Sequence, residues 1–365
     1  MMMAYFDAFA RDYRYYKGGA WCYEDGCIYR GLALLDAADP GGPWFAHLKR
    51  LVDGQIDPDG HLAGYRPEDF NLDNVQAGRA LLFLHRRLGD VRYRIGADAL
   101  AAQLPLQPRT PGGNYWHKLV YPQQVWLDGL YMALPFQLDY ALLVGDRQLY
   151  RDAIAQMESA IILLRDAGTR LYRHGYDAGR VQDWADPVTG LSRAYWSRAM
   201  GWLAMALVDV AELAGPDAGA ITAACTDLAD ILAQHQQPDG RWLQVTDLPD
   251  LEGNYPESSA TAMFAYFYIA GTRLGLRGLS AEPGLRALAG LERHALAPSP
   301  SGRTELQQIC YMAGLGGFSG RNRDGSVGYY LSEPIVADDS KGVGPLMMAA
   351  AERLMRERQP LATAV

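Results

Sequence analysis

A single carboxylate, Asp128, stands inside the apolar stretch WLDGLYMALPF at residues 126–136. An ionised carboxylate in such surroundings loses favourable hydration unless it is paired, hydrogen-bonded or protonated. Helix capping is one explanation, because an aspartate at a helix start accepts a hydrogen bond from a backbone N–H that lacks a partner within the helix. Acid–base chemistry is the other, because a carboxyl group in apolar surroundings is suited to transfer a proton.

Further reactive side chains stand near other predicted helix starts. Arg198 begins a buried segment, where an unpaired guanidinium is costly, so it needs an anion from the protein or from a ligand. Asp73, in NLDNV, either caps its helix or belongs to a site. Trp202 is either a core residue or a platform for a sugar ring. Tyr23, Glu24, Trp126, Glu257 and Lys341 stand at similar positions.

Two loops add histidines to this set. His117 lies in GNYWHK and His174 in LYRHGYD, and each is also explained as an ordinary hydrogen-bonded histidine. Zinc sites use spaced clusters such as HExxH, which the sequence lacks. GxSxG, P-loop and GxGxxG patterns are absent from it as well. We therefore predict neither a metal nor a cofactor.

The elements that would position these residues are helices of two kinds. Segments that begin near residues 23, 73, 128, 198, 258 and 341 are apolar around most of their circumference, which is typical of buried helices. Segments 149–166 and 221–235 carry their apolar residues on one stripe, which indicates an exposed opposite face. Buried helices alternating with amphipathic ones predict an all-α fold, the six-hairpin (α/α)6 barrel or toroid.

In such a barrel the N-terminal ends of the inner helices converge on one end, here called the mouth. Helix N-termini carry partial positive charge, so the mouth suits an anionic ligand. Three connections, DPDGHLAGY, QPDGRWLQV and NRDGSVGYYL, combine Asp-Gly turns with short alternating runs and predict small β-hairpins. Because no Pro- or Ser-rich linker divides the sequence, we expect one domain over residues 1–365.

Composition excludes several classes of partner. The chain has 365 residues, of which 49% are hydrophobic, as in globular proteins. A net charge of −8 without a basic cluster argues against nucleic acid. The sequence shows neither a signal-peptide h-region nor an apolar run long enough for a membrane span, so we expect a cytoplasmic location and no membrane contact. Four scattered cysteines predict reduced thiols rather than a disulfide scaffold.

Four stretches of the chain, in this order, resemble the unsaturated rhamnogalacturonyl hydrolases, glycoside hydrolase family 105. They are WLDGLYMALPF, YWSRAMGW, QPDGRWLQVTDLPDLEGNYPESSATAMFAY and RDGSVGYYLSEPIVADDSKGVGPLMMA. The similarity runs from about Trp21 to Glu352. It implies a six-hairpin α/α barrel, as the helix pattern does, and an unsaturated oligosaccharide as substrate. Such enzymes add water to the 4,5-unsaturated uronic acid that lyases leave at the non-reducing end, and the hydrated product opens and releases the neighbouring sugar.

The same resemblance implies roles for individual residues. Asp128 would be the general acid and base, protonating C4 and activating water for attack at C5, and Asp73 would be the second catalytic aspartate. The residues implied to bind the unsaturated sugar are Tyr23, His117, Trp126, His174, Arg198 and Trp202. A proton donor near neutral pH needs a raised pKa, so we expect desolvation by Trp126, Tyr131 and Trp202 to raise the pKa of Asp128.

Two other functions stay open at this point. A sugar epimerase on a similar α/α toroid would use histidines as acid and base, and a sugar-binding or scaffold protein would keep the barrel without catalysis. The sugar next to the unsaturated residue and the polysaccharide of origin are not fixed by the sequence, because loops at the mouth set that choice. The oligomeric state is open as well.

Overall fold

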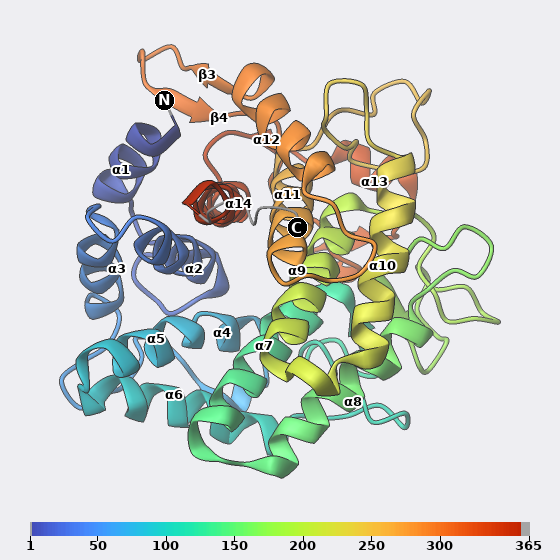
Figure 1. Ribbon diagram of the computed structural model, residues 1–365. Helices are drawn as coiled ribbons and strands as arrows, with labels where there is room; N and C mark the ends of the chain where they lie inside the picture. Colours follow the sequence, from blue (N-terminus) through green and yellow to red (C-terminus); the bar gives the residue numbers. More distant parts are fainter. Residues whose placement is uncertain (1, 359–365) are drawn as a thin grey trace, which may run out of the picture.

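The computed structural model describes residues 2–358. The predicted domain spans 1–365, so its first residue and its last seven, 359–365, lie outside the described residues. Within the described part, long helices form two concentric rings (Figure 1). The inner ring consists of α2 (Tyr23–Ala38), α4 (Asp73–Gln76) followed by α5 (Gly78–Leu88), α7 (Leu127–Val144), α9 (Ser197–Ala214), α11 (Ser258–Arg273) and α14 (Ser340–Arg358).

Contacts between helices close this inner ring. Each inner helix packs on the next in the order α2, α5, α7, α9, α11 and α14, and α14 packs again on α2. The outer ring lies around it and consists of α1 (Met2–Asp12), α3 (Trp44–Asp53), α6 (Val91–Gln103), α8 (Arg147–Leu163), α10 (Gly219–Gln234) and α12 (Glu282–His294). The predicted six-hairpin (α/α)6 barrel is therefore confirmed, with every inner helix starting within one residue of its predicted start.

Burial separates the two rings as the sequence pattern predicts. In α11 every residue from Ser258 to Gly271 is buried, whereas α8 buries only its inward stripe, which includes Ala153, Met157 and Ala160. Glycines allow the closest approach between α2 and α14. A Cβ at Gly344 would lie 2.5 Å from the backbone carbonyl of Cys27, and one at Gly31 would lie 2.7 Å from Cβ of Met347. Larger residues at these positions would force the two helices apart.

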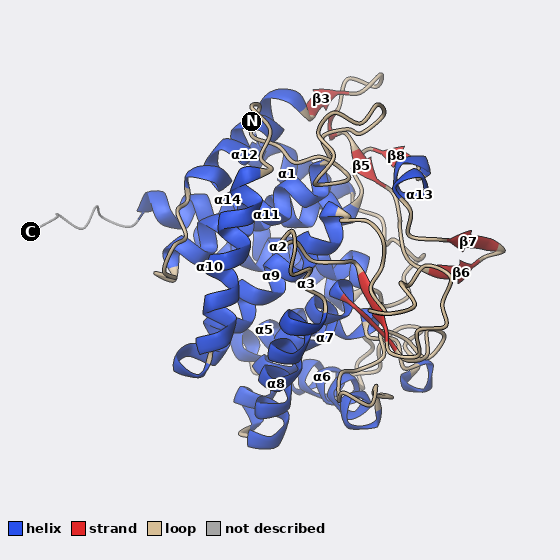
Figure 2. Cartoon of the chain, turned by 90° about the vertical axis from the view of Figure 1, so that its right-hand side faces the viewer, coloured by secondary structure: helices blue, strands red, loops and turns tan. Residues whose placement is uncertain are grey.

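Short strands and connections gather at the mouth of the barrel (Figure 2). The strands pair antiparallel as β1 (Gln124–Trp126) with β2 (Gly175–Asp177), β3 (Leu296–Pro298) with β4 (Thr304–Leu306), β5 (Ile309–Cys310) with β8 (Ile335–Val336), and β6 (Gly316–Phe318) with β7 (Arg321–Arg323). Helix α13 (Val327–Ser332) and the 3-10 turns η1 (Pro67–Asp69), η2 (Leu104–Leu106) and η3 (Gly215–Asp217) complete the described elements.

The predicted loop hairpins are found in part. DPDGHLAGY closes with a single bridge, Ile56 to Leu62, whereas QPDGRWLQV forms no bridge within itself and its Leu243 pairs instead with Pro256, farther along the chain. The hairpin predicted after the Asp-Gly turn of NRDGSVGYYL is wrong, because that run forms α13. The Ser326 side chain accepts a hydrogen bond from the backbone N–H of Tyr329 (3.1 Å) and so caps the helix.

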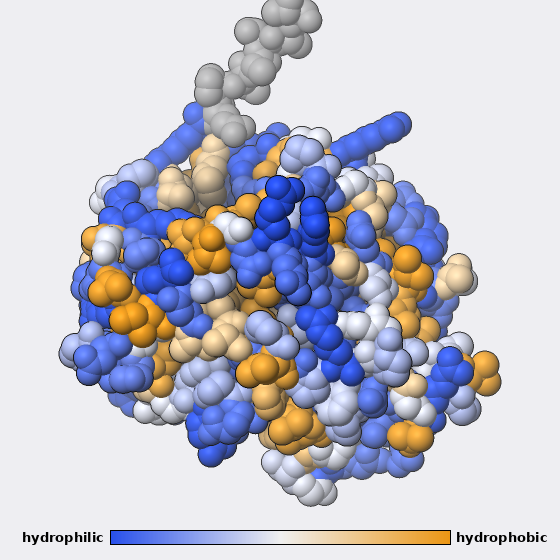
Figure 3. All heavy atoms as spheres, turned by 90° about the horizontal axis from the view of Figure 1, so that it is seen from below, coloured by the Kyte–Doolittle hydropathy of each residue, from blue (hydrophilic) through white to orange (hydrophobic). Residues whose placement is uncertain are grey.

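The surface and the buried thiols agree with a globular chain. On the face shown in Figure 3, apolar residues lie in small groups among charged ones. The four cysteines are buried and unpaired among the described residues, as predicted. By length and composition, the segment Ser197–Asp217, which contains α9, is apolar enough to cross a membrane, but 78% of its most apolar window is buried inside the barrel. Such burial is typical of a helix in the core of a barrel.

A buried ion pair ties two inner helices together across the barrel. The Arg79 guanidinium on α5 donates to Asp209 Oδ2 on α9, and the Tyr266 hydroxyl on α11 donates to Asp209 Oδ1. Asp209 is fully buried and the Arg79 side chain is 7% exposed. Each charge therefore depends on the other for its compensation.

We expect Asp209→Asn to lower the free energy of unfolding by about 3–5 kcal/mol, because it leaves the Arg79 charge buried without an anion. Urea denaturation followed by circular dichroism measures this loss. Asp230→Asn is the matched control, since Asp230 pairs with Arg170 but has 59% of its side chain exposed, and its effect should stay below about 1 kcal/mol. Equal effects of the two substitutions would contradict the structural importance of the buried pair.

Candidate active site

Asp128 lies at the mouth, at the second position of α7. The N-cap position is held by Trp126, so the capping explanation for Asp128 is wrong. The β1–β2 pairing places Trp126 opposite Gly175, and the backbone N–H of Leu127 donates to the carbonyl of His174 (3.0 Å). This pairing brings His174, from a distant loop, beside the start of α7.

Asp128 and His174 form the central contact of the site. Asp128 Oδ2 lies 3.1 Å from His174 Nε2, with the Asp128 side chain 14% exposed and His174 fully buried. This is ion-pair distance, but the two atoms do not meet with hydrogen-bond geometry, and neither has a hydrogen-bond partner elsewhere in residues 2–358. Both atoms are buried, and each is left with an unfilled hydrogen-bonding position.

The predicted rise in the pKa of Asp128 is wrong for this arrangement. Burial by itself raises the pKa of Asp128, but the charge and hydrogen-bonding capacity of His174, and then the charge of His117, outweigh burial and bring the pKa below its ordinary value. The aromatic neighbours are evident in the sequence, whereas the imidazole reaches Asp128 only through the β1–β2 pairing.

Asp73 lies on the other side of His117 and is already paired. Its carboxylate Oδ2 lies 2.5 Å from Lys118 Nζ, and its Oδ1 lies 3.6 Å from His117 Nε2. Leu72 holds the N-cap position of α4, so capping by Asp73 is also wrong. Burial raises the pKa of Asp73, but Lys118 and then His117 outweigh burial and lower it. Asp73 is therefore an ionised carboxylate committed to a lysine.

His117 is held by aromatic stacking. Its ring lies 4.5 Å from the Trp126 ring at 21°, and Tyr121 stacks on Trp126 at 4.7 Å. Gly129, in the WLDG stretch, makes room for it, because a Cβ there would lie 3.0 Å from His117 Nδ1. Burial lowers the pKa of His117 to about 4, with Asp73 acting in the opposite direction. His117 is thus a neutral imidazole at neutral pH, and its charge acts on Asp73 and Asp128 only in acid, where the ring is protonated.

Tyr23 and Trp202 form an aromatic pair beside the two aspartates. The rings meet edge to face at 6.2 Å, and Trp202 also stacks on Tyr131 of α7 at 5.3 Å. Trp202 is buried and Tyr23 half-buried. Of this pair, Tyr23 is therefore the ring that a ligand can reach, and the buried Trp202 packs against it.

Arg198 finds its anion within the protein. Its Nη1 lies 3.9 Å from Glu257 Oε1 and donates to the carbonyl of Cys310, while its guanidinium carbon lies 4.7 Å from the Trp196 ring. Glu257 is fully buried and caps α11 by accepting from the backbone N–H of Ala260 (2.7 Å). Of the two anions that the sequence left open for Arg198, the structure supplies the protein carboxylate.

The structure thus brings the predicted residues together at one mouth. Trp126 meets His174 at 5.3 Å, and His174 meets Trp196, the ring beside Arg198, at 4.8 Å. Sequence reasoning missed Lys118, Trp196 and Tyr330 as members of this group. Lys118 adjoins His117 and could have been flagged by that adjacency, whereas Tyr330 lies in a distant run without a local signal.

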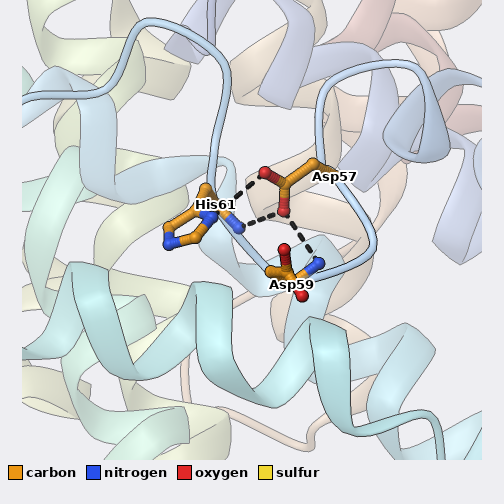
Figure 4. Close-up of side chains that lie close together, drawn as sticks. All are labelled: Asp57, Asp59 and His61. Atoms are coloured by element: carbon orange, nitrogen blue, oxygen red, sulfur yellow. Dashed lines mark hydrogen bonds and ion pairs between the residues drawn. The ribbon is translucent and has the colours of Figure 1, made fainter.

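A separate cluster of possible metal ligands lies in the turn between α3 and η1 (Figure 4). Among residues 2–358, Asp57, Asp59 and His61 are the only group of three or more such residues whose ligand atoms all lie within 4.8 Å of one another. Asp57 Oδ1 accepts from the backbone N–H groups of Asp59 (2.9 Å) and His61 (2.8 Å), and Oδ2 lies 3.0 Å from His61 Nδ1. These contacts are those of a turn.

The buried imidazole of His117 makes a pH-dependent contribution to stability. The unfolded ring binds a proton below its ordinary pKa of 6.5, whereas the folded ring resists protonation down to about 4. We therefore expect stability to fall as pH drops from 6.5 to 4, by about 3 kcal/mol for this group. Urea denaturation at several pH values measures the slope. His117→Gln removes the titrating ring and should flatten it, and an unchanged slope would contradict the assignment.

Comparison with known proteins gives the family. The sequence matches the family described as Glycosyl Hydrolase Family 88 over residues 3–357. Protein Atu3128 of Agrobacterium fabrum is 49% identical over 237 residues, which are 62% of this chain and 100% of that protein. The unsaturated rhamnogalacturonyl hydrolase YesR of Bacillus subtilis is 30% identical over 255 residues, covering 67% of this chain and 69% of that protein.

A solved structure agrees with these matches. The structure described as a C. acetobutylicum glycoside hydrolase from family 105 has a TM-score of 0.89 and 34% sequence identity, covering 96% of this chain and 98% of that chain. The resemblance drawn from the four sequence stretches is thereby confirmed. Because the family match spans nearly all of the sequence and the family 105 structure shares its fold, the chain belongs to Glycosyl Hydrolase Family 88 and is a glycosidase.

Proposed function

We propose that this glycosidase hydrates the C4=C5 double bond of a 4,5-unsaturated uronic acid at the non-reducing end of lyase-generated oligosaccharides. The observation that supports it best is the contrast between the two aspartates. Asp73 is paired with Lys118 at 2.5 Å, whereas Asp128 Oδ2 accepts no hydrogen bond from any described residue. One uncommitted carboxylate suits a reaction that needs one group to give and then recover a proton.

In this reaction the protonated Asp128 gives its proton to C4, and the positive charge left at C5 is shared with the ring oxygen. Water then attacks C5 and returns a proton to the Asp128 carboxylate. The double bond is lost, one C–H and one C–O bond form, and the catalyst is regenerated. The hemiketal at C5 opens, and the resulting hemiacetal at C1 expels the neighbouring sugar.

Ordinary glycoside hydrolysis fits the site less well. It uses two carboxyl groups that flank the glycosidic bond, one as acid and the other as nucleophile or base. Asp73 is not available for the first role, because its carboxylate lies 2.5 Å from the Lys118 ammonium group and is committed to that ion pair. We assign Asp73 to the binding and orientation of substrate hydroxyls.

Substrate binding changes the environment of Asp128 in the direction that catalysis needs. A uronate brings a carboxylate into the mouth and displaces water, and both effects raise the pKa of a neighbouring acid. His174 lies 3.1 Å away and can pass or accept that proton. The resting enzyme therefore stores an ionised Asp128, and the anionic substrate promotes its protonation.

Exposure divides the proposed binding residues into two groups. Tyr23, Asp128 and Lys118 are partly open to solvent and would touch the sugar directly. The residues that we place beneath them, as supports for the binding surface, are His117, Trp126, His174, Arg198 and Trp202. Rhamnose is our proposed neighbouring sugar, since the relative YesR is named a rhamnogalacturonyl hydrolase. A cytoplasmic location remains a prediction.

We expect Asp128→Asn to lower the rate of unsaturated-end hydration by a factor of about 10² to 10⁴, because the amide cannot donate a carboxylic proton. Loss of the near-ultraviolet absorbance of the conjugated double bond measures the rate. Asp250→Asn, at an exposed loop position, is the control and should keep wild-type activity. Wild-type turnover by a correctly folded Asp128→Asn enzyme would exclude the proposal.

Turnover in deuterium oxide separates hydration from direct cleavage. Hydration by the enzyme places one solvent deuterium on a single face of C4, whereas cleavage of the glycosidic bond alone releases an enol that takes up deuterium at C4 from either face. Nuclear magnetic resonance of the product reads the label directly. Comparing pectic, ulvan and glycosaminoglycan fragments in this assay identifies the preferred neighbouring sugar.

Gly129→Ala tests the placement of His117 behind the catalytic carboxylate. The added Cβ would lie 3.0 Å from His117 Nδ1, so the ring must move. We expect kcat/KM to fall about tenfold to a hundredfold, because small displacements of positioned groups are costly in catalysis. Gly219→Ala, at the start of α10, adds a Cβ with no heavy atom within 4 Å and should leave activity unchanged. Equal activity of both variants would contradict this role.

A further inference from the structure

Behind the Asp128–His174 contact lies a third polar group, the hydroxyl of Tyr330. Tyr330 Oη lies 2.7 Å from His174 Nδ1, and His174 Nε2 lies 3.1 Å from Asp128 Oδ2. Tyr330 and His174 are both fully buried. The three side chains therefore form a line of polar atoms that runs from the open mouth into the protein.

Several contacts from other elements hold Tyr330 in this line. The Gln244 side-chain amide donates to the carbonyl of Tyr330 (3.0 Å), and the Trp196 ring stacks on the tyrosine ring at 5.5 Å and 18°. Ser326 caps the short helix α13 that carries the tyrosine. Such a fixed, buried hydroxyl can impose an orientation on the imidazole next to it.

The hydrogen-bonding inventory defines what that orientation is. A neutral imidazole has one N–H donor and one acceptor nitrogen, and an ionised carboxylate only accepts. If the Tyr330 hydroxyl donates to Nδ1, the ring proton must sit on Nε2, facing Asp128. If the ring is cationic, the tyrosine oxygen accepts from Nδ1–H and Nε2–H still faces Asp128. Tyr330 thus serves both protonation states of His174.

We propose that Tyr330 is a positioning residue that acts on Asp128 through His174, by fixing the imidazole with Nε2–H directed at the catalytic carboxylate. This inference rests on the proposed function, because the role of Asp128 as acid and base belongs to that proposal. The same principle operates in other enzymes, where a third group hydrogen-bonds to a catalytic base and fixes its orientation.

Other groups around the pair do not replace this tyrosine. The titratable and charged groups that face the pair or its supporting rings from neighbouring elements are Asp73, His117, Arg198, Cys310, Arg323 and Tyr329. Asp73 is bound to Lys118, and Arg323 donates to the carbonyls of Leu315 and Gly316. Removing the Tyr330 hydroxyl therefore leaves His174 Nδ1 without its described partner.

The test is Tyr330→Phe, studied in the full-length enzyme. We expect kcat to fall about 10- to 100-fold with KM nearly unchanged, as for other groups that orient a catalytic residue from behind. The alkaline limb of the kcat/KM profile should move to higher pH, because a ring that presents Nε2–H to the ionised carboxylate less often stabilises it less and so raises the pKa of Asp128. Nitrogen-15 resonances of His174 should show the Nε2–H tautomer in the wild type and a mixture in the variant.

Tyr329→Phe is the matched control. It removes a tyrosine hydroxyl from the adjacent position of α13, but this hydroxyl accepts from the backbone N–H of Gly314 (3.0 Å) and not from the imidazole. The control should keep the wild-type pH profile and His174 tautomer. A change of equal size in both variants would indicate a structural effect of α13 and would overturn the proposal.

The two proposals fail separately. Full activity in Asp128→Asn would overturn the proposed function. If Asp128→Asn is inactive but Tyr330→Phe keeps the wild-type kcat, pH profile and His174 tautomer, only the role of Tyr330 is overturned. If Tyr330→Phe does not fold, the wild-type spectrum decides alone at a pH where the ring is neutral. The Nε2–H tautomer supports the inference, and the Nδ1–H tautomer overturns it.

Discussion

The pairing of β1 with β2 is the constraint on which the mouth depends. Three residue pairs, ending with Trp126 opposite Gly175, join the start of α7 to a loop that follows the next outer helix. The pairing sets Asp128 against His174 and leaves the Trp126 ring between the two histidines. Without it, the carboxylate of α7 would face an apolar wall and would be protonated or misplaced.

The charges at the mouth follow a common plan with one variation. Acids near the inner helix starts have cations of their own: Asp73 with Lys118, Glu257 with Arg198, and Glu24 with Lys17. Asp128 has an imidazole in the same place. A lysine or arginine keeps its charge at all ordinary pH values, whereas an imidazole can gain or lose one near neutrality. Among these four acids, Asp128 is therefore the one whose nearest basic partner is neither a lysine nor an arginine.

The architecture was predictable from the sequence, because the spacing of apolar residues shows whether a helix is buried on one face or around its whole circumference. Helices such as α11, buried along most of their length, and α8, buried on one stripe, differ in the sequence as clearly as in the fold. The meeting of Asp73, Asp128 and Arg198 at the mouth was also predictable, since inner helix starts converge there, whereas Lys118 and Tyr330 come from connections.

What could not be predicted is decided by residues far apart in the chain. The pKa of Asp128 depends on His174, and the anion of Arg198 is Glu257; neither partner has a sequence spacing that marks it. Likewise, the run after the Asp-Gly turn reads as a strand, yet the Ser326 cap makes it helical. Local pattern predicts an element, but its contacts depend on the assembled ring.

The closure of the inner ring by α14 against α2 also bears on biosynthesis. α2 is made early and α14 last among the inner helices. Because glycines allow their close contact, a surface with larger side chains could not pack on α2 in place of α14. Until α14 leaves the ribosome, the apolar side of α2 that faces it stays uncovered. The nascent chain therefore exposes an apolar surface that is buried only when α14 packs on it. Exposed apolar surface of this kind promotes aggregation during synthesis, which is a cost of the toroidal architecture.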